Sequence, residues 1–115
     1  MQKIKVAIYE DNNGLRDILA SIIRESEEFE LAGEFGHCID VVQNTKAFAP
    51  EVIIMDIDMP GRTGIEGVKE LKAVYPEVEV IMNTVFDDDE KKKREFFDMN
   101  RNSLVSNSVT KRGSN

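Results

Sequence analysis

An apolar run in the middle of this chain leads directly into an aspartate: residues 52–55 read Val-Ile-Ile-Met, and Asp56 follows. A continuous apolar run bounded by turn residues is typical of a strand buried on both faces of a parallel sheet. Pro60 and Gly61 mark a loop after it, so the carboxylate stands where the strand ends. Ligands bind outside the carboxyl ends of the strands in open parallel sheets. The stretch therefore predicts a fold class and a place for chemistry, although an aspartate that only caps a turn fits the same pattern.

Two other predicted strands also end in polar side chains. Residues 4–9 stop at Glu10 and Asp11, and a later strand stops close to Thr84, whose hydroxyl could donate a hydrogen bond to an oxyanion. If these strands are parallel neighbours, three carboxylates converge at one end of the sheet, where their repulsion costs on the order of several kcal/mol. A hard divalent cation such as Mg²⁺ would relieve this repulsion. Alternatively, Glu10 and Asp11 only favour the N-terminus of the helix that follows.

Strand and helix signals alternate along most of the chain. The sequence predicts strands at 3–9, 28–35, 52–55 and 78–83, helices at 14–25, 38–48 and 64–75, and a fourth helix from about residue 87. Such alternation implies right-handed βαβ units and a parallel sheet. The second strand alternates apolar and polar residues, which favours an edge position. The expected strand order is 2-1-3-4, the beginning of the flavodoxin-like order, with Glu10, Asp11 and Asp56 meeting at its switch point.

Composition limits the classes of protein that the chain can represent. Its 115 residues suit one domain, and 41% hydrophobic with 32% charged residues is typical of a soluble globular protein. No apolar run approaches the length of a membrane span, and the N-terminus lacks a signal peptide, so we expect a cytoplasmic protein. The net charge of −7 argues against a nucleic-acid surface over the whole domain. His37 and Cys38 have no further His or Cys with which to form a metal site.

Taken in order, these motifs resemble the receiver domain of two-component response regulators. The segments 56–61 and 84–91 are most similar to the LuxR-type subfamily, and the resemblance extends from residue 1 to residue 91. It implies a CheY-like, doubly wound parallel sheet with Asp56 as the phosphoacceptor and Thr84 as the switch hydroxyl. It also implies a Mg²⁺ site formed by Glu10 through water, Asp11, Asp56 and the backbone carbonyl of Asp58.

The resemblance also implies partners. A sensor histidine kinase would donate the phosphoryl group from its phosphohistidine to Asp56, and the chain itself would not be an enzyme. LuxR-type members usually carry a C-terminal DNA-binding domain and regulate transcription. Because no such domain follows here, we expect no direct DNA binding by this chain.

The chain departs from the family pattern after Lys91. We expect a receiver domain over residues 1–100, with its fifth strand and fifth helix missing or replaced, and a polar, disordered tail over residues 101–115. Residues 103–109 are an alternative candidate for a strand. The family's lysine would fall at Ser106, with Lys111 the only substitute nearby, so we assign no residue to that role. Without a fifth strand the fourth becomes an exposed edge, which predicts a homodimer or a domain-exchanged oligomer.

Two other functions fit parts of the sequence. Asp56 and Asp58 after an apolar strand also resemble the nucleophile motif of haloacid-dehalogenase-type phosphatases, in which the second aspartate is a general acid. That alternative leaves Glu10 and Asp11 without a role, and few residues follow the motif. The other alternative is a degraded receiver that no longer signals and acts only as an interaction module, which the missing lysine favours.

Overall fold

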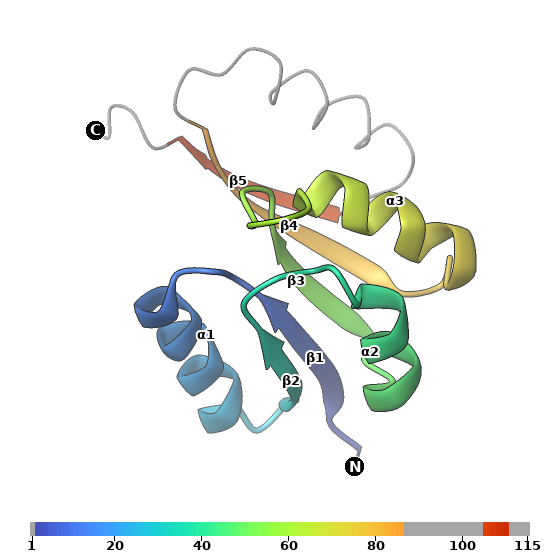
Figure 1. Cartoon of the computed structure of the whole chain (residues 1–115). Coiled ribbons are helices and arrows are strands. Elements are labelled where there is room, and N and C mark those ends of the chain that lie inside the picture. Colours follow the sequence, from blue (N-terminus) through green and yellow to red (C-terminus); the bar gives the residue numbers. More distant parts are fainter. Residues whose placement is uncertain (1, 87–104, 111–115) are drawn as a thin grey trace.

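Parallel strands in the order β2-β1-β3-β4-β5 form one sheet in the computed structural model of the chain (Figure 1). The structure describes residues 2–86 and 105–110. Its strands are β1 (Ile4–Tyr9), β2 (Phe29–Phe35), β3 (Val52–Asp56), β4 (Glu79–Phe86) and β5 (Val105–Thr110), and its helices are α1 (Asn13–Glu25), α2 (Val41–Phe48) and α3 (Gly64–Val74). The predicted fold class, a flavodoxin-like sheet whose order begins 2-1-3-4 with β2 at one edge, is confirmed. The helix expected from residue 87 lies outside the described residues.

Polar side chains set the N-termini of two of the helices. Asn12 precedes α1, and its Oδ1 accepts a hydrogen bond from the amide of Leu15 at 2.9 Å. Thr63 and Glu66 form a reciprocal capping box at the start of α3, so two backbone amides that would otherwise lack partners are paired. Within the described part of the chain, no helix has the length and apolar character needed to cross a membrane.

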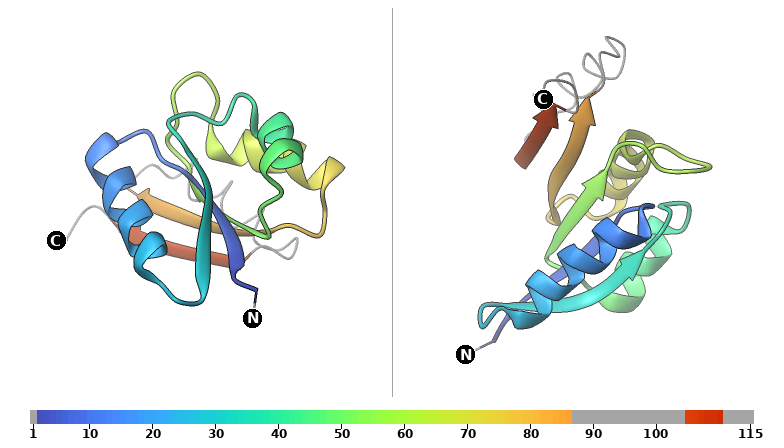
Figure 2. Two further views of the ribbon diagram at one scale, coloured as in Figure 1. Left: turned by 90° about the horizontal axis from the view of Figure 1, so that it is seen from below. Right: turned by 90° about the vertical axis from the view of Figure 1, so that its left-hand side faces the viewer.

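The main core lies between the sheet and one pair of helices. Figure 2 shows α1 on one side of the sheet and α2 and α3 on the other. Because strand side chains alternate between faces, every second residue of β1 and β3, together with Val80 and Met82 of β4, lies on the side of α2 and α3. The buried residues of this core are Ala7, Tyr9, Cys38, Val41, Ile53, Met55, Ile57, Met59, Ile65, Val68, Leu71, Val78, Val80 and Met82. This packing holds the end of β3 rigidly against α3.

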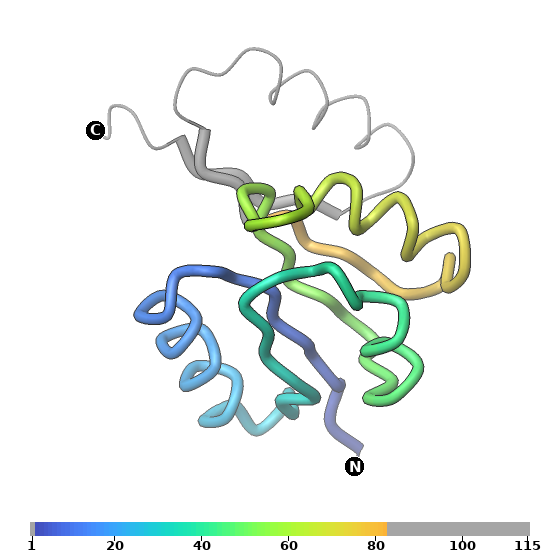
Figure 3. The backbone as a smooth tube through the Cα atoms, in the orientation of Figure 1, coloured from blue at the N-terminus to red at the C-terminus, as the bar shows by residue number. Residues whose placement is uncertain are grey.

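The strand order brings the ends of β1 and β3 together. β1 and β3 are parallel neighbours, and Tyr9 is the register partner of Met55. The residues that follow this pair, Glu10 and Asp56, therefore lie side by side. The turns after β1 and β3 emerge at the same end of the sheet, as the backbone trace shows (Figure 3). This is the switch point at which such sheets bind ligands.

A fifth strand is present, at the place where we expected the family's fifth strand to be missing or replaced. β5 pairs in parallel with β4 from Ile81↔Val105 to Phe86↔Thr110. A strand therefore occupies residues 105–110 of the segment 101–115, for which we expected a disordered tail. The alternative prediction, a strand over residues 103–109, agrees better with the observed bounds. Backbone amides and carbonyls make the ladder, so an edge strand forms even from a polar sequence.

The fifth strand changes two further expectations. β4 extends to Phe86 instead of ending at Asn83, because the pairing with β5 continues beyond the last contact with β3, Asp56↔Asn83. β4 is also covered on both sides, by β3 and β5. The reason given for dimerisation, an exposed β4 edge, therefore does not hold.

Candidate functional site

Three carboxylates lie together at the switch point. Glu10 and Asp11 follow β1, and Asp56 ends β3. One carboxylate oxygen from each lies within 4.8 Å of the others. Glu10 and Asp56 are 4% and 9% exposed, whereas Asp11 faces the solvent. The structure thus brings together three of the residues that the sequence predicted, in a site that is buried on one side and open on the other.

Arg16 holds the loop that carries Glu10 and Asp11. Its guanidinium donates to the backbone carbonyl of Glu10 at 2.7 Å and to Oδ1 of Asn13 at 2.6 Å. It also lies 3.8 Å from the carboxylate of Glu34, on the neighbouring strand β2. The Glu10 side chain is fixed in turn by the amide of Asn12, which donates to its Oε2 at 3.1 Å. Sequence reasoning did not identify Arg16, although a base on a mainly apolar helix just after an acidic pair was a visible signal.

The turn after Asp56 folds back tightly onto the end of β3. The amide of Asp58 donates to Oδ1 of Asp56 at 3.3 Å, and the amide of Gly64 donates to the carbonyl of Ile57 at 2.8 Å. A Cβ at Gly64 would lie 2.0 Å from the backbone oxygen of Asp56, so only glycine permits this approach. Gly64, predicted as the first residue of a helix, therefore allows α3 to begin directly beside Asp56.

The environment of the cluster favours protonated carboxyl groups when no cation is bound. Burial raises the pKa of Asp56 to about 7, and repulsion from Glu10 adds to the effect. Burial also raises the pKa of Glu10, against the opposing hydrogen bond from Asn12. Both shifts have the sign expected for like charges in a poorly solvated site. Because ionisation of these carboxyl groups costs free energy, a cation that binds beside them stabilises their charged forms.

The chemistry of these ligands fits Mg²⁺. The site offers hard carboxylate oxygens from three residues, and the repulsion between them is relieved by a divalent ion. Asp58, the fourth predicted ligand, is not among these carboxylates; its side chain is exposed in the loop after β3, and its predicted contribution is a backbone carbonyl. The open side of the cluster leaves room for water and for phosphate oxygens, which Mg²⁺ commonly retains as ligands.

Thr84 lies in β4, within the strand and not after its end. The register pairs Asp56 with Asn83, so the backbone of Thr84 is one residue farther toward the carboxyl end of the sheet. The structure describes the backbone of Thr84 but not its side chain, so its role as the switch hydroxyl stays a prediction. His37, which beyond Cys38 has no further histidine or cysteine with which to bind a metal, lies in the loop before α2, where its Nδ1 accepts from the amide of Ile39 at 3.4 Å.

Comparison with known proteins agrees with this geometry. The family described as "Response regulator receiver domain" matches residues 6–112. The chain is 32% identical over 88 residues to the uncharacterized transcriptional regulatory protein YxjL of Bacillus subtilis, a match that covers 76% of this chain and 40% of that protein. It is 34% identical over 90 residues to the chemotaxis protein CheY of Halobacterium salinarum, covering 78% of this chain and 73% of that one. A further match, to a protein-glutamate methylesterase of Pyrococcus horikoshii, covers only 22% of that enzyme.

Solved structures show the same fold. The response regulator domain of Thermotoga maritima CheB superimposes with a TM-score of 0.78 at 28% identity, covering 96% of this chain and 80% of that one. A LuxR-family DNA-binding response regulator from Staphylococcus aureus gives a TM-score of 0.77 at 27% identity, covering 94% and 86%. The chain spans about two fifths of the length of the transcriptional regulators that it matches in Bacillus subtilis, YxjL at 40% and LnrK at 39%.

Proposed function

Because this chain belongs to the response regulator receiver domain family, we propose that it accepts a phosphoryl group on Asp56 from a sensor histidine kinase. The observation that carries the proposal is the convergence of Glu10, Asp11 and Asp56 within 4.8 Å at the switch point. Asp56 ends β3, and its carboxylate accepts a hydrogen bond from the turn that follows the strand.

The reaction requires an ionised Asp56 and a path for the phosphoryl group. An oxygen of Asp56 attacks phosphorus, the bond to the donor's imidazole nitrogen breaks, and an acyl phosphate remains on Asp56 while the electron pair leaves with the imidazole. Glu10, Asp11, Asp56 and the carbonyl of Asp58 would hold Mg²⁺, with Glu10 acting through water. When bound, the ion neutralises charge on the transferring group.

The residues of the chain supply the positioning. The amide of Asp58 donates to Oδ1 of Asp56, which restrains the carboxylate and leaves its other oxygen for the attack. The Arg16 contact to the Glu10 carbonyl restrains the opposite wall of the site. Thr84 would donate its hydroxyl to a phosphoryl oxygen, and its backbone position beyond Asn83 supports this role.

We infer a transcriptional output, because YxjL and LnrK are transcriptional regulatory proteins. The relatives are more than twice as long as the matched segment, so their remaining residues carry whatever DNA-binding function they have. The net charge of −7 makes these 115 residues a poor DNA surface. We propose that the domain passes its signal on by contact with another domain or protein and has no enzymatic activity of its own.

The alternative of a non-signalling interaction module has one observation in its favour. The expected lysine position, Ser106, lies in β5 opposite Met82 in the register, and the structure describes no lysine in β5. A lysine at that place would help to neutralise the acyl phosphate. Its absence affects retention of the phosphoryl group more than binding of a cation.

Intact mass after incubation of the full chain with acetyl phosphate and Mg²⁺ tests the proposal. We expect the parent to gain the mass of one phosphoryl group and Asp56→Asn to gain none. Asp58→Asn is the matched control: it removes an exposed carboxylate two residues away but keeps the backbone carbonyl, so it should still be labelled. No gain in the parent would favour the interaction module, and turnover of a phosphate monoester would favour the phosphatase.

A further inference from the structure

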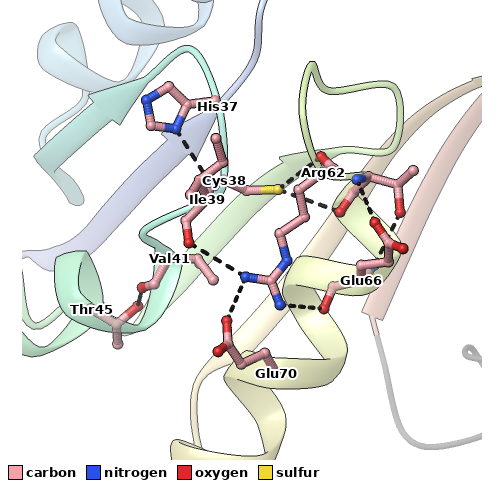
Figure 4. A network of polar contacts seen from close by, with 9 residues as sticks. His37, Cys38, Ile39, Val41, Thr45, Arg62, Glu66 and Glu70 are labelled. Carbon is pink, nitrogen blue, oxygen red and sulfur yellow. Dashed lines mark hydrogen bonds and ion pairs between the residues drawn. The ribbon is translucent and has the colours of Figure 1, made fainter.

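The loop after Asp56 is fastened to two other parts of the molecule by Arg62. Its guanidinium donates to the carboxylate of Glu70 in α3 at 2.6 Å and to the carbonyl of Ile39 in the β2–α2 loop at 3.4 Å. It also donates to the carbonyl of Glu66 at 3.3 Å. Figure 4 shows the guanidinium between these three acceptors, which come from two separate segments. One side chain thus links the phosphoacceptor loop, the β2–α2 loop and α3.

The backbone of the same loop is held from the other side by Cys38. Its thiol donates to the carbonyls of Arg62 and Thr63 at 3.3 and 3.4 Å (Figure 4). Cys38 is fully buried, and a Cβ at Gly67 would lie 3.0 Å from its sulfur, so the thiol has little room to move. Burial raises the pKa of the Cys38 thiol, which keeps its proton in place at neutral pH.

These contacts add to those at the two ends of the loop, where the amide of Asp58 donates to Asp56 and the amide of Gly64 donates to the carbonyl of Ile57. Gly61, between these ends, has a φ of 78°, a conformation that glycine adopts without a steric penalty. Met59 is 7% exposed and supplies the apolar anchor of the loop. The loop carries Asp58, whose amide contacts Asp56 and whose carbonyl is the proposed Mg²⁺ ligand. The conformation of the loop therefore decides whether that carbonyl reaches the site.

We propose that Arg62 is a positioning residue, which holds the loop after Asp56 in the conformation that presents the Asp58 carbonyl to Mg²⁺. The inference rests on the proposed function for its metal and on the contacts above for its geometry. The Arg62 side chain is 25% exposed, so part of its ion pair with Glu70 is shielded from solvent. The planar guanidinium donates from two nitrogens to acceptors on both segments, whereas a lysine would offer a single nitrogen.

The sign of the change in Mg²⁺ affinity separates positioning from simple electrostatics. Arg62→Gln removes a positive charge near a cation site, so electrostatics alone predicts tighter or unchanged Mg²⁺ binding. If Arg62 positions the loop, its loss instead predicts weaker Mg²⁺ binding. We expect the dissociation constant to rise about 3- to 10-fold, at or below the effect of removing a direct partner of a metal ligand. Arg62→Lys keeps the charge but not the fork and should give an intermediate value.

The experiment is a calorimetric titration of the full chain with Mg²⁺, using Lys69→Gln as the matched control. Lys69 is exposed on α3, so its loss removes an equal charge without touching the loop. Glu70→Gln removes the anionic partner of Arg62, but loss of a negative charge weakens cation binding by itself, so this variant is judged by the amide exchange of residues 58–64, which should be faster than in the parent. Unchanged or tighter Mg²⁺ binding in Arg62→Gln would overturn the proposal.

Hydrogen exchange of the metal-free protein provides a readout that does not depend on Mg²⁺. We expect the amides of residues 58–64 to exchange faster in Arg62→Gln, while those of β1 and β3 stay as in the parent. Equal exchange in the loop would overturn the restraint that we assign to Arg62. A parent that binds no Mg²⁺ would instead contradict the proposed function, and with it the metal step of this inference.

Discussion

The role proposed for Asp56 requires a charged carboxylate, but the buried site around this residue disfavours the charged form. As the proposed nucleophile it must be ionised, yet the residue is 9% exposed and close to Glu10. Its pKa of about 7 reflects this conflict. The stability of the metal-free protein should therefore depend on pH through Asp56, with a contribution from Glu10, whose pKa burial also raises. The same conflict supplies the driving force for cation binding.

Asp56→Asn should stabilise the metal-free protein at about pH 8, by roughly 1–3 kcal/mol in the free energy of unfolding. Asp56 has a raised pKa in the folded state, so the folded form binds the proton more tightly than the unfolded form does. The parent therefore loses stability as the pH rises from about 4, the unfolded value, to about 7, and the amide variant avoids this loss. Urea unfolding of both proteins across this range measures the difference, which should vanish at the acid end; a constant difference would contradict the assignment.

Gly64 is the second residue on which the site depends. Gly64→Ala places a methyl group 2.0 Å from the backbone oxygen of Asp56, so the start of α3 must move away from the strand end. We expect a loss of about 2 kcal/mol or more in the free energy of unfolding, together with weaker Mg²⁺ binding. The control is Gly14→Ala in α1, where the nearest atom is 3.4 Å away and alanine should add up to about 1 kcal/mol. Equal effects at both positions would mean that the close approach is not real.

At the scale of the elements, α3 connects local stability to the site. It begins next to Asp56, its first turn is closed by the capping box of Thr63 and Glu66, and its apolar face packs on the sheet. Thr63 also accepts the Cys38 thiol through its backbone carbonyl, a contact that does not involve its side chain. The cap can therefore be removed without breaking that contact.

Thr63→Ala should lower the free energy of unfolding by about 1 kcal/mol, because the amide of Glu66 loses its side-chain partner at the helix N-terminus. Chemical denaturation of the two proteins measures the change. Ser21→Ala, at an exposed position inside α1, is the matched loss of a hydroxyl and should be neutral or slightly stabilising. A neutral Thr63→Ala would show that tertiary packing alone sets the start of α3.

At the scale of the whole molecule, β5 decides which edge of the sheet is exposed. It pairs with β4 from Ile81 to Phe86, and β2 forms the opposite edge. Without β5, the amides and carbonyls of β4 would face solvent on one side, and β4 is more apolar than β5. Exposed strand edges of this kind pair with other chains.

A chain truncated before Val105 should therefore associate in a concentration-dependent way more strongly than the full chain. Size-exclusion chromatography with light scattering over a range of concentrations measures this. A chain that ends after Thr110 keeps β5 and is the matched control for the loss of the last residues. If both truncated chains have the same mass at every concentration, β5 does not protect β4.

The sequence by itself determined the βαβ order, the edge position of β2 and the meeting of Glu10, Asp11 and Asp56. Those features follow from the local periodicity of apolar residues and from the rule that parallel strands end on the same side of the sheet. Both can be read from the order of residues along the chain. Only the tertiary structure decided between a strand and a disordered tail for residues 105–110. The β4–β5 ladder is made by backbone groups, and a polar side-chain pattern does not show that they will pair. Sequence reasoning also missed Arg16 and Arg62, since each contacts groups from distant segments that only the fold brings close to it.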